Sequence, residues 1–403
     1  MANLKVLMMG GRRCGKTSAL ASLFDQMTNT QDIYSLLTVA DKTILEVKTT
    51  SNGDEEKQEK LANKKLELQS FLKKYTSSDF LVDKGPTKNY WLYKMQIALA
   101  GTSKTMMMEF RDAAGEFFDH GGQHTTETLK YVQDCDVFIV VIDTPYLMCD
   151  DDAVCDAANV TDSIHSFLTS IDKDSNNNQE LSPRMVMFVP IKCEKWLHEG
   201  KISDVNDKIK AKYAPTIQHL MARGEMEISI VPVETAGGIE FSEMREAWII
   251  SSNGGRIIGK DNKPIGSPDF PYTKCSKTTS KTYILENGVP YALKDGDLPN
   301  LDPEAVFKFD NEDLDIPRPA SWYHLWNNAP KYQPHNCEQI ALHVLRFYLN
   351  VTKKHRNGGW WERFLGRFGR ITLQDLNNTI VELYNRGMIK DDKDGIERLM
   401  KYQ

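Results

Sequence analysis

The chain has 403 residues, of which 40% are hydrophobic, so it is long enough to form one large domain with insertions or two domains. Its net charge of −6 gives no electrostatic reason to bind nucleic acid or an anionic membrane, and we expect no direct nucleic-acid partner. Seven cysteines without a CxxC pair argue against a zinc site and a disulfide framework. Because the sequence shows neither a signal-peptide pattern nor a run of about 18 apolar residues, we expect a soluble cytoplasmic protein.

The segment GGRRCGKT, residues 10–17, is the first informative motif. It follows an apolar run typical of a buried strand, and the spacing of residues 16–27 predicts a helix after it. The segment fits the pattern GxxxxGK[ST], in which loop N–H groups and the first turn of the next helix surround a phosphate. The alternative is a glycine-rich turn with a chance lysine, and the strand–loop–helix context favours the phosphate loop.

This motif predicts specific contacts to a nucleotide. We expect Lys16 to reach the β- and γ-phosphates, where it would also assist catalysis, and the Thr17 hydroxyl to ligate Mg²⁺. The residues expected to contact the phosphates are Gly10, Arg13, Cys14, Gly15, Lys16, Thr17 and Ser18.

Strand-like and helix-like segments alternate after the loop, which indicates a mostly parallel sheet. A Gly-Thr turn joins the strands predicted over 89–100 and 103–110, so we expect these two to form an antiparallel pair at the sheet edge. The predicted strands are 89–100, 103–110, 136–142, 185–191 and 226–233, and the predicted helices are 125–135, 160–171 and 205–223. The expected fold class is therefore α/β, a P-loop NTPase in a three-layer α/β/α sandwich with insertions and a helical C-terminal extension.

Several segments lie outside a minimal nucleotide-binding domain. Residues 41–80 are predicted to insert a charged amphipathic helix, and residues 241–333 a β-rich or irregular segment whose ENGVP motif signals a hairpin. The helix predicted over 336–351, with Asn336 and Gln339 in capping-box positions, would close the domain. We therefore expect a nucleotide domain over 1–240 plus 334–352, and a helical extension over 353–403.

An aspartate and a glycine follow the strand predicted to end near residue 110. Asp112 at this strand tip could hold Mg²⁺ beside the phosphate loop, and the N–H of Gly115 could face a γ-phosphate. The alternative is an ordinary strand-end turn. Upstream, Thr87 in KGPTKNYW offers a second hydroxyl for Mg²⁺, and a simple turn there is an equally good interpretation.

Two further motifs concern the nucleotide base. Where many GTPases end a strand with NKxD, this chain has IKCE: Lys192 keeps the lysine, the asparagine is missing, and Glu194 keeps a carboxylate with one more methylene. After the last predicted strand, Thr235 and Ala236 supply the S/T-A dipeptide whose backbone can contact guanine O6. A carboxylate that pairs N1–H and N2–H₂ favours guanine over adenine, because adenine would leave buried polar groups unpaired.

The phosphate loop, DAAG at 112–115, IKCE at 191–194 and TA at 235–236 occur in an order and spacing that resembles a Ras-like P-loop GTPase of the translation-factor-related class. The resemblance covers residues 1–240 and the helix at 336–351. More narrowly, FRDAAGE, PIKCEKW and the NCEQ-led helix are similar to the bacterial double-GTPase families. This resemblance implies a molecular switch that binds GTP and GDP with Mg²⁺ and signals to protein partners, such as a sister GTPase or an effector.

One departure from the family pattern concerns hydrolysis. Glu116 stands where many of these GTPases carry a glutamine that positions water. Because a carboxylate donates no N–H to the transition state, we expect hydrolysis to be slow or to depend on a partner. His124, in the loop DHGGQH, is a candidate replacement and completes the predicted catalytic set with Lys16 and Glu116; a surface histidine is the plainer interpretation.

The basic aromatic stretch 353–370 either packs on the body of the protein or offers a peripheral contact to a membrane or a partner. Two other functions stay open from the sequence. One is a P-loop ATPase, and the other is a hydrolysis-deficient nucleotide-binding scaffold, which the two glutamates at 116 and 194 would suit.

Overall fold

The fold is described from a computed structural model of the chain. The described residues are 3–11, 14–29, 37–39, 44–47, 91–99, 105–113, 115–118, 135–170, 183–237, 239–250, 281–286, 289–292, 318–325, 333–354 and 373–402.

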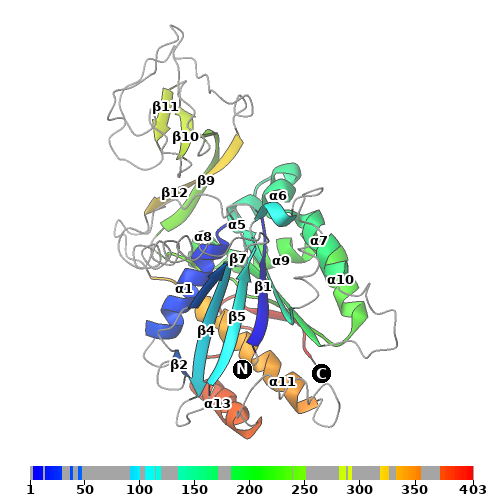
Figure 1. Cartoon of the computed structure of the whole chain (residues 1–403). Coiled ribbons are helices and arrows are strands. Elements are labelled where there is room, and N and C mark those ends of the chain that lie inside the picture. The colour runs from blue at the N-terminus through cyan, green and yellow to red at the C-terminus, as the bar shows by residue number, and fades with distance from the viewer. Residues whose placement is uncertain are drawn as a thin grey trace, which may run out of the picture.

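The main sheet has nine strands in this part of the chain, in the order β13-β8-β7-β6-β1-β5-β4-β2, with β3 also paired to β4 (Figure 1). Its centre is parallel, while β4 runs antiparallel to β5 and β13 antiparallel to β8. The strands are β1 (Asn3–Met9), β2 (Leu37–Val39), β3 (Ile44–Val47), β4 (Trp91–Leu99), β5 (Thr105–Asp112), β6 (Val137–Asp143), β7 (Arg184–Ile191), β8 (Met226–Ile230) and β13 (Glu397–Met400).

Helices cover both faces of this sheet, so the chain has an α/β architecture (Figure 1). Side chains of β1 alternate between the two cores: Val6 and Met8 pack with one set of helices, and Leu7 and Met9 with the other. The first face carries α1 (Lys16–Asn29), α11 (Cys337–Lys354) and α13 (Leu373–Asn385), and the second carries α6 (Asp152–Asn159), α7 (Thr161–Ser170), α9 (Ile202–Lys212) and α10 (Ala214–Arg223). Short helices at the strand ends are η1 (Gly115–Phe118), α5 (Thr144–Leu147) and α8 (Glu194–His198).

A second, antiparallel sheet stands at one end of the molecule, next to α8 (Figure 1). It has the order β11-β10-β9-β12 and comprises β9 (Ile239–Ile250), β10 (Lys281–Glu286), β11 (Val289–Ala292) and β12 (Arg318–Leu325). The hairpin predicted at ENGVP is confirmed, because β10 pairs with β11 and places Glu286 opposite Val289.

Other predicted elements can be compared with the structure. The antiparallel pair β4–β5 is confirmed, but its predicted place at the sheet edge is wrong, because β2 and β3 also pair with β4. The single helix predicted over 205–223 is wrong, because α9 ends at Lys212 and α10 starts at Ala214, with Pro215 in its first turn. Within 41–80, residues 44–47 form a strand instead of helix, and the stretch predicted to be the charged helix lies outside the described residues, as does the helix predicted over 125–135.

The C-terminal extension was predicted to be helical, and this is correct only in part. Residues 373–385 form a helix, but residues 397–400 add an edge strand to the main sheet. The stretch ERLM has only four residues, so its pattern could not distinguish an edge strand from a loop. The basic aromatic stretch lies outside the described residues beyond Lys354. Among the described helices, none has both the length and the apolarity needed to cross a membrane.

A buried ion network joins this extension to the body. Arg346 of α11 has a side chain that is only 2% exposed, and it pairs with Glu227 of β8 at 2.5 Å and with Asp391. Arg398 of β13 lies 3.4 Å from Glu227 and 3.5 Å from Asp391. Two guanidinium groups therefore neutralise two carboxylates where the last strand joins the sheet.

Candidate functional site

The carboxyl ends of the parallel strands lie at the same end of the main sheet. β1 lies between β5 and β6, and the strand order continues to β4 on one side and to β7 and β8 on the other. Crevices at such a point bind ligands in α/β sheets. The segment after β1 is the predicted phosphate loop. Gly10 has φ 145° and Gly15 φ 104°, which are backbone conformations that favour glycine. A Cβ atom on Gly11 would lie 1.8 Å from the carbonyl oxygen of Ala158, so the loop also lies directly against α6.

Lys16, the first residue of α1, is buried at 7% exposure. Its ammonium group donates hydrogen bonds to the carbonyl oxygens of Gly10 and Gly11, both at 2.9 Å. The loop therefore curls around the lysine. The third N–H of the ammonium faces Sγ of Cys14 at 3.9 Å, a weak acceptor that a phosphate oxygen in the loop could replace.

Thr17 and Asp112 are brought together although they are 95 positions apart. The Thr17 hydroxyl donates to Oδ2 of Asp112 at 2.8 Å, and Asp112 is 1% exposed. β1 and β5 are parallel neighbours with Met8 opposite Asp112, which places the strand tip beside the start of α1. The pair presents a hydroxyl and a carboxylate next to the phosphate loop, and both are oxygen ligands of the kind that Mg²⁺ prefers.

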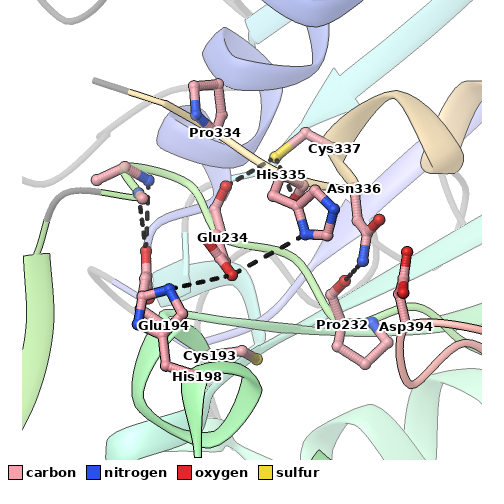
Figure 2. Close-up of polar contacts among 12 residues, drawn as sticks. Cys193, Glu194, His198, Pro232, Glu234, Pro334, His335, Asn336, Cys337 and Asp394 are labelled. Carbon is pink, nitrogen blue, oxygen red and sulfur yellow. Dashed lines mark hydrogen bonds and ion pairs between the residues drawn. The ribbon is translucent and has the colours of Figure 1, made fainter. Parts of the chain in front are cut away.

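Glu194 begins α8 at the end of β7, and it is 3% exposed (Figure 2). Its Oε1 accepts hydrogen bonds from the backbone N–H groups of Ala236 and Gly237, both at 3.4 Å. The predicted base-side elements IKCE and TA are therefore adjacent. Burial raises the pKa of Glu194 to about 7, although the backbone donors lower it.

Lys192 lies just before this glutamate and has a positive φ of 59°. Its ammonium pairs at 2.5 Å with Oδ2 of Asp143, at the tip of β6. Asn159 holds the backbone of Asp143 from both sides, accepting from its N–H at 2.8 Å and donating to its carbonyl at 3.4 Å. Burial raises the pKa of Asp143, while the charge of Lys192 opposes the shift.

Ile191 occupies the position where the family pattern has asparagine. A Cβ atom on Gly15 would lie 2.5 Å from Cδ1 of Ile191, so this side chain packs directly on the phosphate loop. The missing asparagine is thus replaced by an apolar contact between the loop and the base side.

Glu234 adds a second buried carboxyl behind the predicted base site, at 7% exposure. Its Oε1 lies 3.8 Å from Nε2 of His198 and 3.9 Å from Nδ1 of His335 (Figure 2). Burial, and next the charge of Glu194, raise the pKa of Glu234 to about 8, while the charge of Lys390 lowers it. Two neighbouring carboxyl groups, Glu194 and Glu234, therefore both have pKa values raised to near neutral pH.

The replacement Glu234→Gln tests this environment. A carboxyl whose pKa is raised on folding stabilises the fold while protonated; that contribution is complete below its ordinary pKa of 4.5 and is lost as the pH rises through about 8. The variant should therefore exceed the original protein in free energy of unfolding by about 1–3 kcal/mol at pH 9 and match it at pH 4.5. Urea denaturation without nucleotide measures this. The exposed Glu199→Gln variant is the control and should match the original protein at both pH values. If Glu234→Gln also matched the original protein at both pH values, the prediction would be contradicted.

The other predicted site residues divide into two groups. Cys14 is buried in the loop, Ser18 follows Thr17 in α1, and Gly115 begins η1 three residues after Asp112. Arg13, Thr87 and His124 lie outside the described residues, and only the backbone of Glu116 is described.

The sequence reasoning missed three residues of this region. Asp143 had a usable signal, because a carboxylate ends the continuous apolar run of β6. Glu234 also had one, because it directly precedes the predicted Thr235-Ala236 dipeptide. Asn159 had none, since only the tertiary fold brings it to Asp143.

No family model matches the chain, and no curated protein matches it either. Among solved structures, the chain is similar to the GTPase-like domain of Ski7 from S. cerevisiae, bound to GDP and inorganic phosphate, with 14% identity and a TM-score of 0.31. The match covers 68% of this chain and 48% of that one, so it spans about half of the solved domain.

Proposed function

We propose that this protein is a Ras-like P-loop GTPase that binds guanine nucleotides with Mg²⁺, hydrolyses GTP to GDP, and acts as a molecular switch on protein partners. The observation that carries the proposal is the hydrogen bond between Thr17 and Asp112 beside the loop that surrounds Lys16. A hydroxyl, a carboxylate and a buried ammonium converge there at the carboxyl edge of a parallel sheet, which is the chemistry that a nucleotide phosphate with a divalent cation requires.

On the phosphate side, each residue has a separate task. Lys16 would neutralise charge on the β- and γ-phosphates, and the loop would hold them beside the start of α1. Thr17 and Asp112 would hold Mg²⁺, which when bound neutralises charge on the phosphate oxygens. Glu116 cannot donate a hydrogen bond to an attacking water in its ionised form, so hydrolysis would be slow or depend on a partner.

On the base side, Glu194 would read guanine. An ionised carboxylate accepts from N1–H and N2–H₂ together, and the N–H of Ala236 would donate to O6. Adenine lacks this donor pair, so the buried carboxylate would be left unpaired.

This assignment predicts that GDP affinity depends on pH. Guanine donors bind the ionised form of Glu194, but with a pKa of about 7 in the free protein this form is depleted at acidic pH. GDP should therefore bind roughly tenfold more weakly at pH 6 than at pH 8. Calorimetric titration measures the affinity, and pyrophosphate serves as the control for pH effects on the phosphates. If the two ligands show the same pH dependence, Glu194 does not read the base.

The proposed activity is tested by phosphate release from GTP and from ATP in Mg²⁺ buffer, with the purified protein in excess. Release from GTP at a rate at least about tenfold above that from ATP would support a GTPase. Faster release from ATP would identify an ATPase instead. Binding without release from either nucleotide, both by the protein alone and with a partner protein added, would identify the nucleotide-binding scaffold. This is the second candidate because Glu116 and Glu194 depart from the family pattern.

A further inference from the structure

The inserted sheet is attached to the body at the loop that would read the base. We call residues 234–237 and 333–336 the root. Two backbone hydrogen bonds of 3.0 Å join Glu234 and His335 in both directions, and the N–H of Gln333 donates to the carbonyl of Ala236 at 2.9 Å. β9 begins two residues after Gly237. The chain therefore enters the inserted sheet from the predicted base-reading loop and returns onto the same loop.

Helix α1, which follows the phosphate loop, forms hydrogen bonds with both segments of the root. Ser22 donates to the carbonyl of Thr235 at 2.7 Å, and Gln26 donates to the carbonyl of Pro334 at 2.8 Å. Gln26 also accepts from the N–H groups of Cys337 and Glu338 at 2.7 and 3.3 Å. A side chain of α1 thus caps α11, in place of the capping box predicted from Asn336 and Gln339.

Helix α8 holds the first part of β9. The ring of Phe241 stacks on Trp196 with centroids 5.6 Å apart and planes inclined by 12°. The ammonium of Lys195 lies 5.3 Å from the centre of the same Phe241 ring. Because α8 also begins with Glu194, one short helix joins the predicted base-reading carboxylate to the inserted sheet.

Glu194 is already engaged with the root in this arrangement (Figure 2). Its Oε1 lies 3.4 Å from the backbone nitrogens of both Ala236 and Gly237. A base edge between the carboxylate and these N–H groups needs a hydrogen bond of about 2.9 Å on each side. The observed gap is too short for this, so the Glu194 carboxylate must leave the two N–H groups of the root when a base enters.

We propose that the inserted sheet, formed by β9, β10, β11 and β12, transmits the nucleotide-bound state of the switch. Entry of the base moves this sheet by separating α8 from the root. This inference rests on the proposed function, since it requires guanine nucleotide to bind at Glu194. The base and the root compete for the same carboxylate, so the nucleotide favours the separated state. A ligand that fills only the phosphate loop does not compete for Glu194 and leaves the root closed.

Hydrogen exchange of the full chain tests this coupling with two ligands. GDP and pyrophosphate, each with Mg²⁺, should both slow exchange in the phosphate loop. GDP alone should speed exchange by at least about fivefold over residues 236–241, because α8 releases the loop and the start of β9. Protection of the phosphate loop by GDP with unchanged or slower exchange over 236–241 would overturn the coupling and leave the proposed function standing. If neither ligand protected the loop, the proposed function and this inference would both fall.

Two glycine variants provide a matched pair for the same question. Gly237 and Gly224 have φ values of 71° and 69°, but a Cβ on Gly237 would lie 1.9 Å from the carbonyl oxygen of Gln333, whereas one on Gly224 meets nothing within 4 Å. Gly237→Ala should weaken the closed root and tighten GDP binding about fivefold without changing pyrophosphate binding, because coupling is reciprocal. Gly224→Ala should change neither affinity. Unchanged or weaker GDP binding in Gly237→Ala would contradict the proposal.

Discussion

Replacing Lys16 with alanine will abolish GDP binding, with an expected loss of at least about 100-fold in affinity. The Lys16 ammonium is buried within the loop, where its charge acts at reduced dielectric. A hydrogen bond to a charged group contributes about 1.5–3 kcal/mol, and each 1.4 kcal/mol corresponds to about tenfold in affinity. The lost contact to the β-phosphate of GDP, together with the two loop carbonyls that Lys16 no longer holds, accounts for the predicted loss, which fluorescence titration with labelled GDP would measure.

The control for this variant is Lys201→Ala. Lys201 pairs with Glu199 at the surface, with 60% of its side chain exposed, so its removal should leave the affinity within about twofold. A thermal melt of Lys16→Ala is also needed, because the ammonium holds two loop carbonyls. A folded Lys16→Ala protein that binds GDP as well as the original would show that the loop is not a phosphate site.

Replacing Arg346 with alanine will destabilise the fold by about 3–5 kcal/mol. Glu227, its partner in β8, has a side chain with no exposed surface, and its other neighbouring cation, Arg398, lies at 3.4 Å. Removing Arg346 leaves a buried carboxylate with half of its compensating charge and opens a cavity between α11 and the sheet. Urea denaturation of the nucleotide-free protein would measure the free energy of unfolding.

Arg386→Ala is the matched control for this second prediction. Arg386 also forms an ion pair, with Glu382 at 2.8 Å, but both side chains are 43% exposed. Its loss should cost less than about 0.5 kcal/mol. If the two arginine variants were equally stable, the buried network would not be what attaches the C-terminal strand to the sheet.

Local sequence patterns predicted much of the main sheet because its central strands are continuous apolar runs. The same reasoning placed Thr17 at the start of the helix after the phosphate loop and Asp112 at a strand end beside that loop. The structure brings them within 2.8 Å, while their roles toward Mg²⁺ stay a prediction. The break between α9 and α10 could have been expected from Pro215, which lies within the helix predicted over 205–223.

Other features had no local signal. Asn336 was predicted to cap α11, but it adopts φ 63° and donates to the carbonyl of Pro232, because Gln26 supplies the cap from more than 300 residues away. The root likewise depends on pairing between residues about 100 positions apart, Glu234 and His335. Pairings over such separations are set by tertiary packing, so no pattern within either segment could predict them.

The measurement that tests the central claim most directly is a titration of the purified protein with GDP and with ADP in Mg²⁺ buffer at pH 8. At this pH Glu194 is mostly ionised, so its carboxylate can accept from guanine. The account predicts saturable GDP binding at an affinity at least about 100-fold above that for ADP, since a site built around hydrogen bonds strongly rejects a ligand that lacks them. Equal affinities, or a preference for ADP, would contradict the role of Glu194 and with it the assignment of guanine.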